Sequence, residues 1–277
     1  MLQAFGALIF SSAYMVFSRY ILARKHFEYK RYIALTYIFG ALLLLIGFSY
    51  LDLTFVTWRS GILLMLIIAT AIFCDLFFYH GLEHTKVEKV EPLFLSSWVF
   101  TVIFAVLVYP SERDMFKVAL ALVAGITIIL VNIKKHHLKL DKYAVYILVA
   151  AVVIGIHNNL IKALLEYYNP YTINLIIMLG GSLVMPLFFR IKGKDLRKKA
   201  TPLVMLATVF TVTRWLFLYW SYDVIGIVFT SLIMTAAPML EIWGSRLFLK
   251  EKLHIRYIIG TVVIMLCIIV SFLPLGF

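Results

Sequence analysis

The stretch YWSYDVIGIVFTSLIMTAAPMLEIWGSRLFLKEKLHIRYIIGTVVIMLCIIV, Tyr219 to Val270, decides the fold. It contains two apolar runs, Ile227–Leu249 and one from Tyr257 that continues to Leu273, joined by the charged segment Lys250-Glu251-Lys252. At roughly 1.5 Å of rise per residue, each run is about long enough to cross a bilayer core of roughly 30 Å. The first run carries small and polar residues, whereas the second is almost purely aliphatic after Gly260. We therefore expect the first helix to face something other than lipid.

A similar arrangement occurs earlier in the chain. The segment Leu76–Val131 can be laid over Leu216–Leu266 with a gap of a few residues, which pairs Glu83 with Asp223 and Gly125 with Gly260. Internal similarity between two halves of a hydrophobic chain is typical of transporters that are built from repeats.

The end of the chain resembles an EamA-type repeat of the drug/metabolite transporter superfamily. In that repeat a proline-bearing helix leads to a short loop with a glutamate, and then to a helix that opens on glycine. The matching positions are Pro238, Glu251 and Gly260 in the second half, and Glu112 and Gly125 in the first. Trp98 stands where the first repeat would have proline. The resemblance implies ten helices in two five-helix repeats around a central cavity, and export or exchange of small metabolites.

Composition places the chain in the membrane. Hydrophobic residues make up 63% of the 277 residues and the mean hydropathy is +0.98, whereas soluble domains are roughly 45–50% apolar. We expect an all-α polytopic membrane protein of one integral domain, with a first repeat over 1–135 and a second over 136–277. Met1–Leu22 lacks a basic segment before its apolar run and is expected to be the first membrane helix, not a cleaved signal. Cys74 and Cys267 both fall inside apolar runs and are expected to be buried thiols.

Apolar runs predict about ten spans, at 2–22, 33–51, 61–81, 91–109, 115–133, 143–164, 171–189, 202–220, 227–249 and 257–275. Basic residues gather in the first, third, fifth, seventh and ninth loops, whereas the other loops hold only Arg59, Arg113 and Lys117. The positive-inside rule then predicts that both termini lie outside the cell membrane and that the two repeats have opposite orientations. The net charge of +12 therefore indicates topology, and we expect no nucleic-acid partner.

Charged and strongly polar residues inside a span are functional candidates, because a charge at the bilayer centre costs at least about 2.5–3.5 kcal/mol. They are Arg214 on the eighth span, Asp75 on the third, Glu241 on the ninth and the run His157-Asn158-Asn159 on the sixth. From the predicted topology, Arg214 and Asp75 differ in depth by very roughly 10 Å.

One hypothesis is that Arg214 holds an anionic group of a substrate, since its planar fork suits carboxylate or phosphate. Asp75 or Glu241 would then be a proton-coupling acid. The alternative is that Arg214 is a strut between helices. The substrate-binding candidates are Arg214, His157, Asn158, Tyr14, Trp98, Trp215 and Thr235.

Three further features have structural interpretations. Tyr219, Trp220 and Tyr222 stand at a span end and favour an aromatic belt at the membrane surface. Met115–Ile133 and Tyr257–Pro274, the fifth and tenth helices, are apolar all round and are expected to be outer scaffold or homodimer contacts. Glu112 and Glu251, the loop acids, favour either a substrate role or stabilisation of a helix N-terminus through its dipole.

An enzyme is disfavoured. The segment His80-Gly81-Leu82-Glu83-His84 spells the H-x-x-E-H signature of inverted zinc peptidases. A catalytic zinc needs a third protein ligand, however, and the motif is short enough to arise by chance. The chain contains no Walker-type phosphate loop, glycine-rich dinucleotide turn or nucleophile elbow, so we expect no cofactor.

The sequence thus favours a secondary transporter of a small organic metabolite that works by alternating access, with proton-coupled export as one form of it. Two alternatives stay open. One is a translocase of lipids or lipid-linked head groups, and the other is a membrane subunit that does not transport.

Overall fold

The structure, a computed structural model, describes residues 1–23, 27–53, 57–84, 87–132, 142–189, 201–237, 240 and 255–271. These residues form α-helices and two short 3-10 helices, with no β-strand in the described ranges. The elements are α1 (Leu2–Ala23), α2 (Tyr29–Leu45), η1 (Phe48–Tyr50), α3 (Trp58–His84), α4 (Val87–Val108), η2 (Pro110–Glu112), α5 (Met115–Asn132), α6 (Lys142–Leu164), α7 (Pro170–Phe189), α9 (Thr201–Ile225), α10 (Ile227–Met234) and α12 (Ile255–Ser271). The all-α prediction is confirmed, as expected for a chain whose backbone polar groups find no water in lipid.

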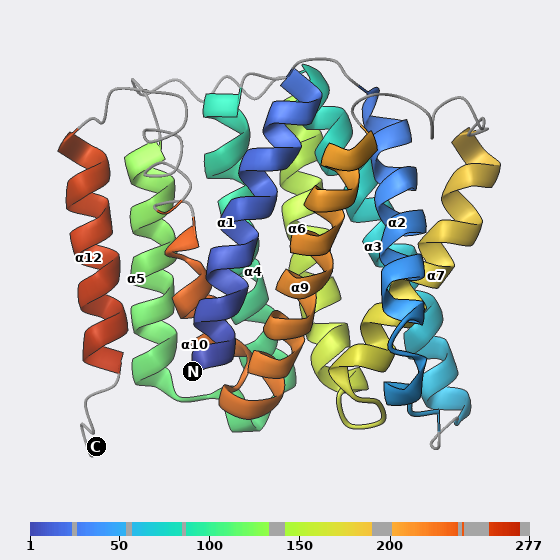
Figure 1. The fold of residues 1–277 in the computed structure, drawn as a ribbon. Helices are drawn as coiled ribbons and strands as arrows, with labels where there is room; N and C mark the ends of the chain where they lie inside the picture. Colours follow the sequence, from blue (N-terminus) through green and yellow to red (C-terminus); the bar gives the residue numbers. More distant parts are fainter. Residues whose placement is uncertain are drawn as a thin grey trace.

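Five of the described helices, α1, α3, α6, α7 and α9, are long and apolar enough to cross a membrane. Shorter apolar helical segments at Ser96–Val108, Met115–Thr127 and Ile258–Ser271 accompany them. The helices stand side by side as one bundle, and the start of α1 lies at the same end as the end of α12 (Figure 1). An even number of crossings gives this placement.

The helix contacts are related by a two-fold symmetry: replacing each helix by its counterpart in the other half gives another observed contact. If α1–α5 are matched in order with α6, α7, α9, α10 and α12, then the α1–α9 contact corresponds to the α3–α6 contact. The α2–α7, α4–α10 and α5–α12 contacts each correspond to themselves. The helices α1 and α6, which open the two halves, run in opposite directions (Figure 1). This is the geometry of an inverted repeat, in which a substrate site lies where the halves meet.

Two predicted spans differ from the helices of the structure: the second ends early, and the ninth is interrupted by a turn. The second was expected to reach residue 51, but α2 ends at Leu45 and is followed by a turn and by η1. The Tyr171 hydroxyl, from the start of α7, donates a hydrogen bond to the Leu44 carbonyl at that end. The ninth was expected over 227–249; α10 ends at Met234, where the Thr235 hydroxyl lies 2.6 Å from the Leu232 carbonyl in a turn, and Ala237 and Leu240 are helical again. Residues 238–239 and 241–249 of that span lie outside the described residues.

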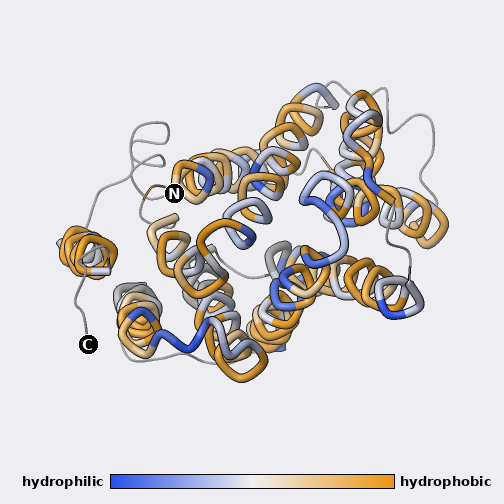
Figure 2. The backbone as a smooth tube through the Cα atoms, turned by 90° about the horizontal axis from the view of Figure 1, so that it is seen from below, coloured by the Kyte–Doolittle hydropathy of each residue, from blue (hydrophilic) through white to orange (hydrophobic). Residues whose placement is uncertain are grey.

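The helices α5 and α12 pack against each other at the margin of the bundle (Figures 1 and 2). Their outward side chains are aliphatic; Ile259 and Ile269 of α12 are more than half exposed. A surface of this composition is compatible with lipid, because hydrocarbon tails are as apolar as isoleucine. The homodimer through these two helices stays a prediction.

The loop acid Glu112 links the two halves. Its Oε1 accepts a hydrogen bond from the backbone N–H of Ile227 (2.9 Å), and its Oε2 accepts one from Val228 (3.1 Å). The carboxylate therefore caps the N-terminus of α10, where the positive end of the helix dipole and the first unpaired N–H groups favour an anion. Of the two roles weighed for this residue, the structure thus provides the contacts of a cap. Glu251 lies outside the described residues.

Gly226 makes this contact possible. Its φ of +85° is a conformation that side-chain-bearing residues rarely adopt, and a Cβ there would lie 2.8 Å from the Glu112 Oε1. The backbone between α9 and α10 thus turns at the point where the Glu112 carboxylate of the other half approaches it.

The loop that carries Glu112 ends at Asp114, where α5 begins. Hydrogen bonds from Lys117 hold the pKa of Asp114 below its usual value.

We predict that Glu112→Ala lowers the free energy of unfolding by about 1–2 kcal/mol, because two N–H groups of α10 lose their acceptor. Glu112→Gln keeps one acceptor oxygen and should lose less. The measurement is unfolding of the purified protein in mixed micelles by increasing SDS. Asp114→Asn, at an exposed ion pair of the same loop, is the control and should change little. An alanine variant as stable as the parent would show that the cap does not contribute.

Candidate functional site

A cavity of about 50 Å³ lies inside the bundle. It is lined by Tyr14 of α1, Ile33, Thr36 and Tyr37 of α2, Ala71, Cys74, Asp75 and Tyr79 of α3, Ile154 and His157 of α6, Asn174, Ile177 and Met178 of α7, and Thr211, Arg214, Trp215 and Tyr219 of α9. Among the described residues, the lining thus comes from the first three helices of each half. Space of this size holds a few water molecules, so a metabolite needs the lining to move apart.

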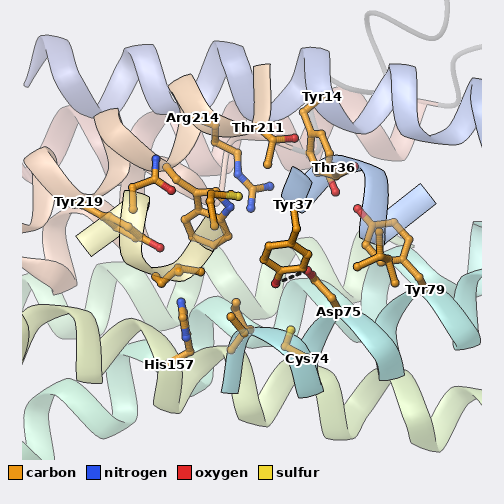
Figure 3. A pocket seen from close by; sticks show the side chains of 17 residues that line it. Tyr14, Thr36, Tyr37, Cys74, Asp75, Tyr79, His157, Thr211, Arg214 and Tyr219 are labelled. Atoms are coloured by element: carbon orange, nitrogen blue, oxygen red, sulfur yellow. Dashed lines mark hydrogen bonds between the residues drawn. The ribbon is translucent and has the colours of Figure 1, made fainter. Parts of the chain in front are cut away.

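Arg214 projects into the cavity from α9 (Figure 3). Its guanidinium carbon lies 4.1 Å from the centre of the Trp215 ring and 5.0 Å from that of Tyr14 on α1. Both distances fall within cation–π range, where the ring faces attract a cation. The two aromatic side chains hold the guanidinium at the cavity wall, and its donor fork suits a carboxylate or phosphate.

Asp75 projects from α3 and lies beside Tyr37 of α2 (Figure 3). The Tyr37 hydroxyl donates a hydrogen bond of 2.8 Å to the Asp75 Oδ2. Asp75 and Arg214 were expected at different depths, and the structure places both on the same cavity. A cation and an acid thus share one small polar space inside an apolar bundle.

His157 enters the cavity from α6. Its Nδ1 lies 2.9 Å from the Thr70 hydroxyl of α3, and its ring meets that of Trp215 edge-to-face with centroids 6.1 Å apart. The side chain is 2% exposed. The α3–α6 contact therefore fixes the imidazole beside the ring that stacks on Arg214.

The cavity brings together five of the predicted site residues and leaves three outside its lining. Arg214, His157, Tyr14, Trp215 and Asp75 belong to it. Asn158 is buried, and its amide donates to the Thr101 hydroxyl of α4 (3.1 Å). Trp98 packs against the apolar core, and the Thr235 hydroxyl bonds its own helix end. Glu241 lies outside the described residues.

Sequence reasoning missed the contributions of α2 and α7. Thr36, Tyr37 and Asn174 line the cavity although neither helix was expected to contribute. The sequence contained a signal for Asn174, because an amide in the seventh span is costly in lipid and is expected to face the inside of the bundle. Its Nδ2 donates to the Val212 carbonyl of α9 (3.2 Å).

The aromatic belt expected at the end of the eighth span is only partly exposed. Trp220 is 53% exposed, whereas Tyr219 and Tyr222 are buried. The reason is that α9 continues to Ile225, five residues beyond the expected end, which carries these positions into the bundle. Tyr219 lines the cavity instead.

The H-x-x-E-H segment forms an aromatic cluster at the end of α3. The rings of His80 and His84 have centroids 4.7 Å apart, and His84 stacks on Tyr143 of α6 with the planes 7° apart. Within the ranges that the structure describes, no three His, Cys, Asp or Glu side chains gather into a group able to hold a metal ion. The side chain of Glu83 is not among those described.

Comparison with known proteins agrees with this architecture. A model of the EamA-like transporter family matches residues 1–133 and again residues 141–273. A solved structure titled only "Crystal structure of protein" superposes with a TM-score of 0.73 at 13% sequence identity, over 98% of this chain and 95% of that one. At this identity the likeness concerns the fold alone. No curated protein matches the sequence.

We predict that Tyr37→Phe lowers the free energy of unfolding by about 1–3 kcal/mol, because the Asp75 carboxylate loses its hydrogen-bond donor in a buried setting. In the Asp75→Asn background the same change should cost less, so the two substitutions are not additive. Unfolding by SDS of the four members of this double-mutant cycle gives the coupling. Strict additivity would show that the Tyr37–Asp75 bond contributes nothing.

Proposed function

The chain belongs to the EamA-like transporter family of the drug/metabolite transporter superfamily, and from this premise we propose which cargo it carries and how. We propose that it is a secondary transporter which moves a small organic metabolite with an anionic group across the cell membrane. The cargo binds in the cavity beside Arg214, and the two halves expose that cavity to each side in turn. Both termini lie outside in this proposal.

The observation that carries the proposal is the position of Arg214. A cation inside a membrane bundle is costly to insert and is therefore a candidate for a functional role. Here it lies between Tyr14 and Trp215 on a cavity lined by helices of both halves. Inverted-repeat transporters bind cargo at such a junction near the bilayer midplane.

The cavity volume supports alternating access as the mechanism. At about 50 Å³ the cavity has room for little more than water, so a metabolite needs the lining to move apart. Because the packed pair α1–α9 lies across the cavity from the packed pair α3–α6 (Figure 3), a movement of one pair against the other would enlarge the cavity toward one face at a time. The cross-half contact of Glu112 with α10 lies outside this lining.

Asp75 is the candidate for proton coupling in this proposal. It is the carboxylate that shares the cavity with Arg214 in the described part of the chain. A proton on Asp75 changes the charge that the cargo meets, which would link proton and cargo movement. Glu241 was the other candidate and has no described structure to argue from.

We predict that Arg214→Gln abolishes transport while the protein stays folded. Purified protein is reconstituted in proteoliposomes after a thermal-shift screen of organic acids, amino acids, nucleobases, sugars and polyamines has identified a stabilising ligand. Counterflow of that ligand is then measured. Arg214→Lys keeps the charge without the planar fork and should retain a fraction of the rate.

Arg59→Gln is the matched control, because Arg59 is an exposed arginine at the start of α3 and should not affect counterflow. Normal counterflow by the Arg214→Gln variant would remove Arg214 from the site. Absence of counterflow by the parent with every ligand would favour a non-transporting subunit. Scrambling of labelled lipid by the parent would favour the lipid translocase.

A further inference from the structure

We propose that Thr70 is a positioning residue that fixes the tautomer of His157, so that the imidazole presents its Nε2 lone pair to the cavity as a hydrogen-bond acceptor. Neither the family match nor the fold assigns a role to Thr70, which lies on α3 outside the cavity lining. The tautomer stands on the geometry alone. Its consequence for the cargo rests on the proposed function.

The hydroxyl of Thr70 has three oxygen or nitrogen neighbours and only one proton. Its Oγ1 lies 2.8 Å from the Leu66 carbonyl, 3.1 Å from the Ile67 carbonyl and 2.9 Å from the His157 Nδ1. A carbonyl oxygen can only accept a hydrogen bond, whereas a hydroxyl can donate one and accept two.

These numbers of donors and acceptors favour one arrangement of the hydrogen bonds. If Thr70 donates to its own helix, as Ser and Thr commonly do four residues back, its lone pair is left to accept the Nδ1–H of His157. Both hydrogen bonds are then made. If Thr70 donated to Nδ1 instead, its hydrogen bond to the Leu66 carbonyl would be lost. The first arrangement makes one bond more, so it is preferred, and Nδ1 carries the proton.

The other ring nitrogen faces the cavity. In Figure 3 the His157 side chain extends from α6 toward the space between α6 and α9. Trp215 of α9 contacts the ring edge-to-face. With the proton on Nδ1, the Nε2 of a neutral imidazole is an acceptor and cannot donate.

Hydrogen-bond donors and acceptors therefore come from different residues of the cavity. Arg214 offers donors only, whereas the His157 Nε2 and the Asp75 carboxylate offer acceptors. A cargo that satisfies both kinds of group carries its anionic group toward Arg214 and an N–H or O–H donor toward His157. The chemical class inferred is a small organic anion that also carries a hydrogen-bond donor.

The tautomer is tested directly by ¹⁵N NMR of histidine-labelled protein in nanodiscs. The chain has seven histidines, so His157→Asn identifies the His157 signals by their loss. We expect a protonated Nδ1 and an unprotonated Nε2 in the parent and in Thr70→Ser. In Thr70→Val the preference for Nδ1–H should be lost. A protonated Nε2 in the parent, or an unchanged spectrum in Thr70→Val, would overturn the positioning role.

The cargo consequence is tested with two anions of similar size, glycolate and methoxyacetate, of which only glycolate has a hydroxyl donor. Affinities come from ligand-dependent thermal stability. For the parent and Thr70→Ser, methoxyacetate should bind roughly two- to tenfold more weakly than glycolate, the value of one hydrogen bond. In Thr70→Val the difference should disappear. Equal binding by the parent would overturn the donor requirement.

The two experiments separate this inference from the proposed function. Stabilisation by neither anion, together with the expected NMR signals, would reject the anionic cargo and leave the role of Thr70 standing. Stabilisation by both anions with a protonated Nε2 would reject the role of Thr70 and leave the anion site standing.

Discussion

The structure depends on how it keeps the Arg214 guanidinium inside a membrane bundle. Insertion scales assign at least about 2.5–3.5 kcal/mol to such a charge at the bilayer centre. The ring faces of Trp215 and Tyr14 offset part of that cost, each contributing about 0.5–2 kcal/mol according to how dry the site is. Because Tyr14 comes from α1 and Trp215 from α9, the cation also binds together helices from opposite halves.

The cavity and the frame around it use different helices. The first three helices of each half line the cavity, whereas α4, α5, α10 and α12 contact one another beside it. Glu112 ties the loop between α4 and α5 to the N-terminus of α10, so its bond lies within that frame. The frame is joined to the cavity helices as well, since α4 packs closely against α6 and α10 contacts α1 and α9. The same outer helices present an aliphatic surface to lipid.

Most of the architecture could be predicted from the sequence, because a bilayer demands apolar runs of one length and basic residues at one face. The expected span boundaries agree with most of the observed helix ends within a few residues. The sequence did not predict which side chains of a helix point into the cavity. Lipid and a packed helix are both apolar, so α2 and α7 show little periodicity to distinguish the face that bears Tyr37 or Asn174. The turn after α10 also escaped prediction, since the apolar run continues past Met234 and only local hydrogen bonds at Thr235 mark the turn, beyond which Ala237 and Leu240 are helical again.

Labelling of Cys74 tests the central claim, a cavity that opens to each membrane face in turn. This thiol lines the cavity and is 3% exposed. With Cys267 replaced by alanine, a membrane-impermeant anionic methanethiosulfonate is added to one face of oriented vesicles, and in a second sample to the other. The account predicts that Cys74 reacts from either face. Reaction from one face alone, or from neither when the SDS-unfolded protein reacts readily, would contradict it.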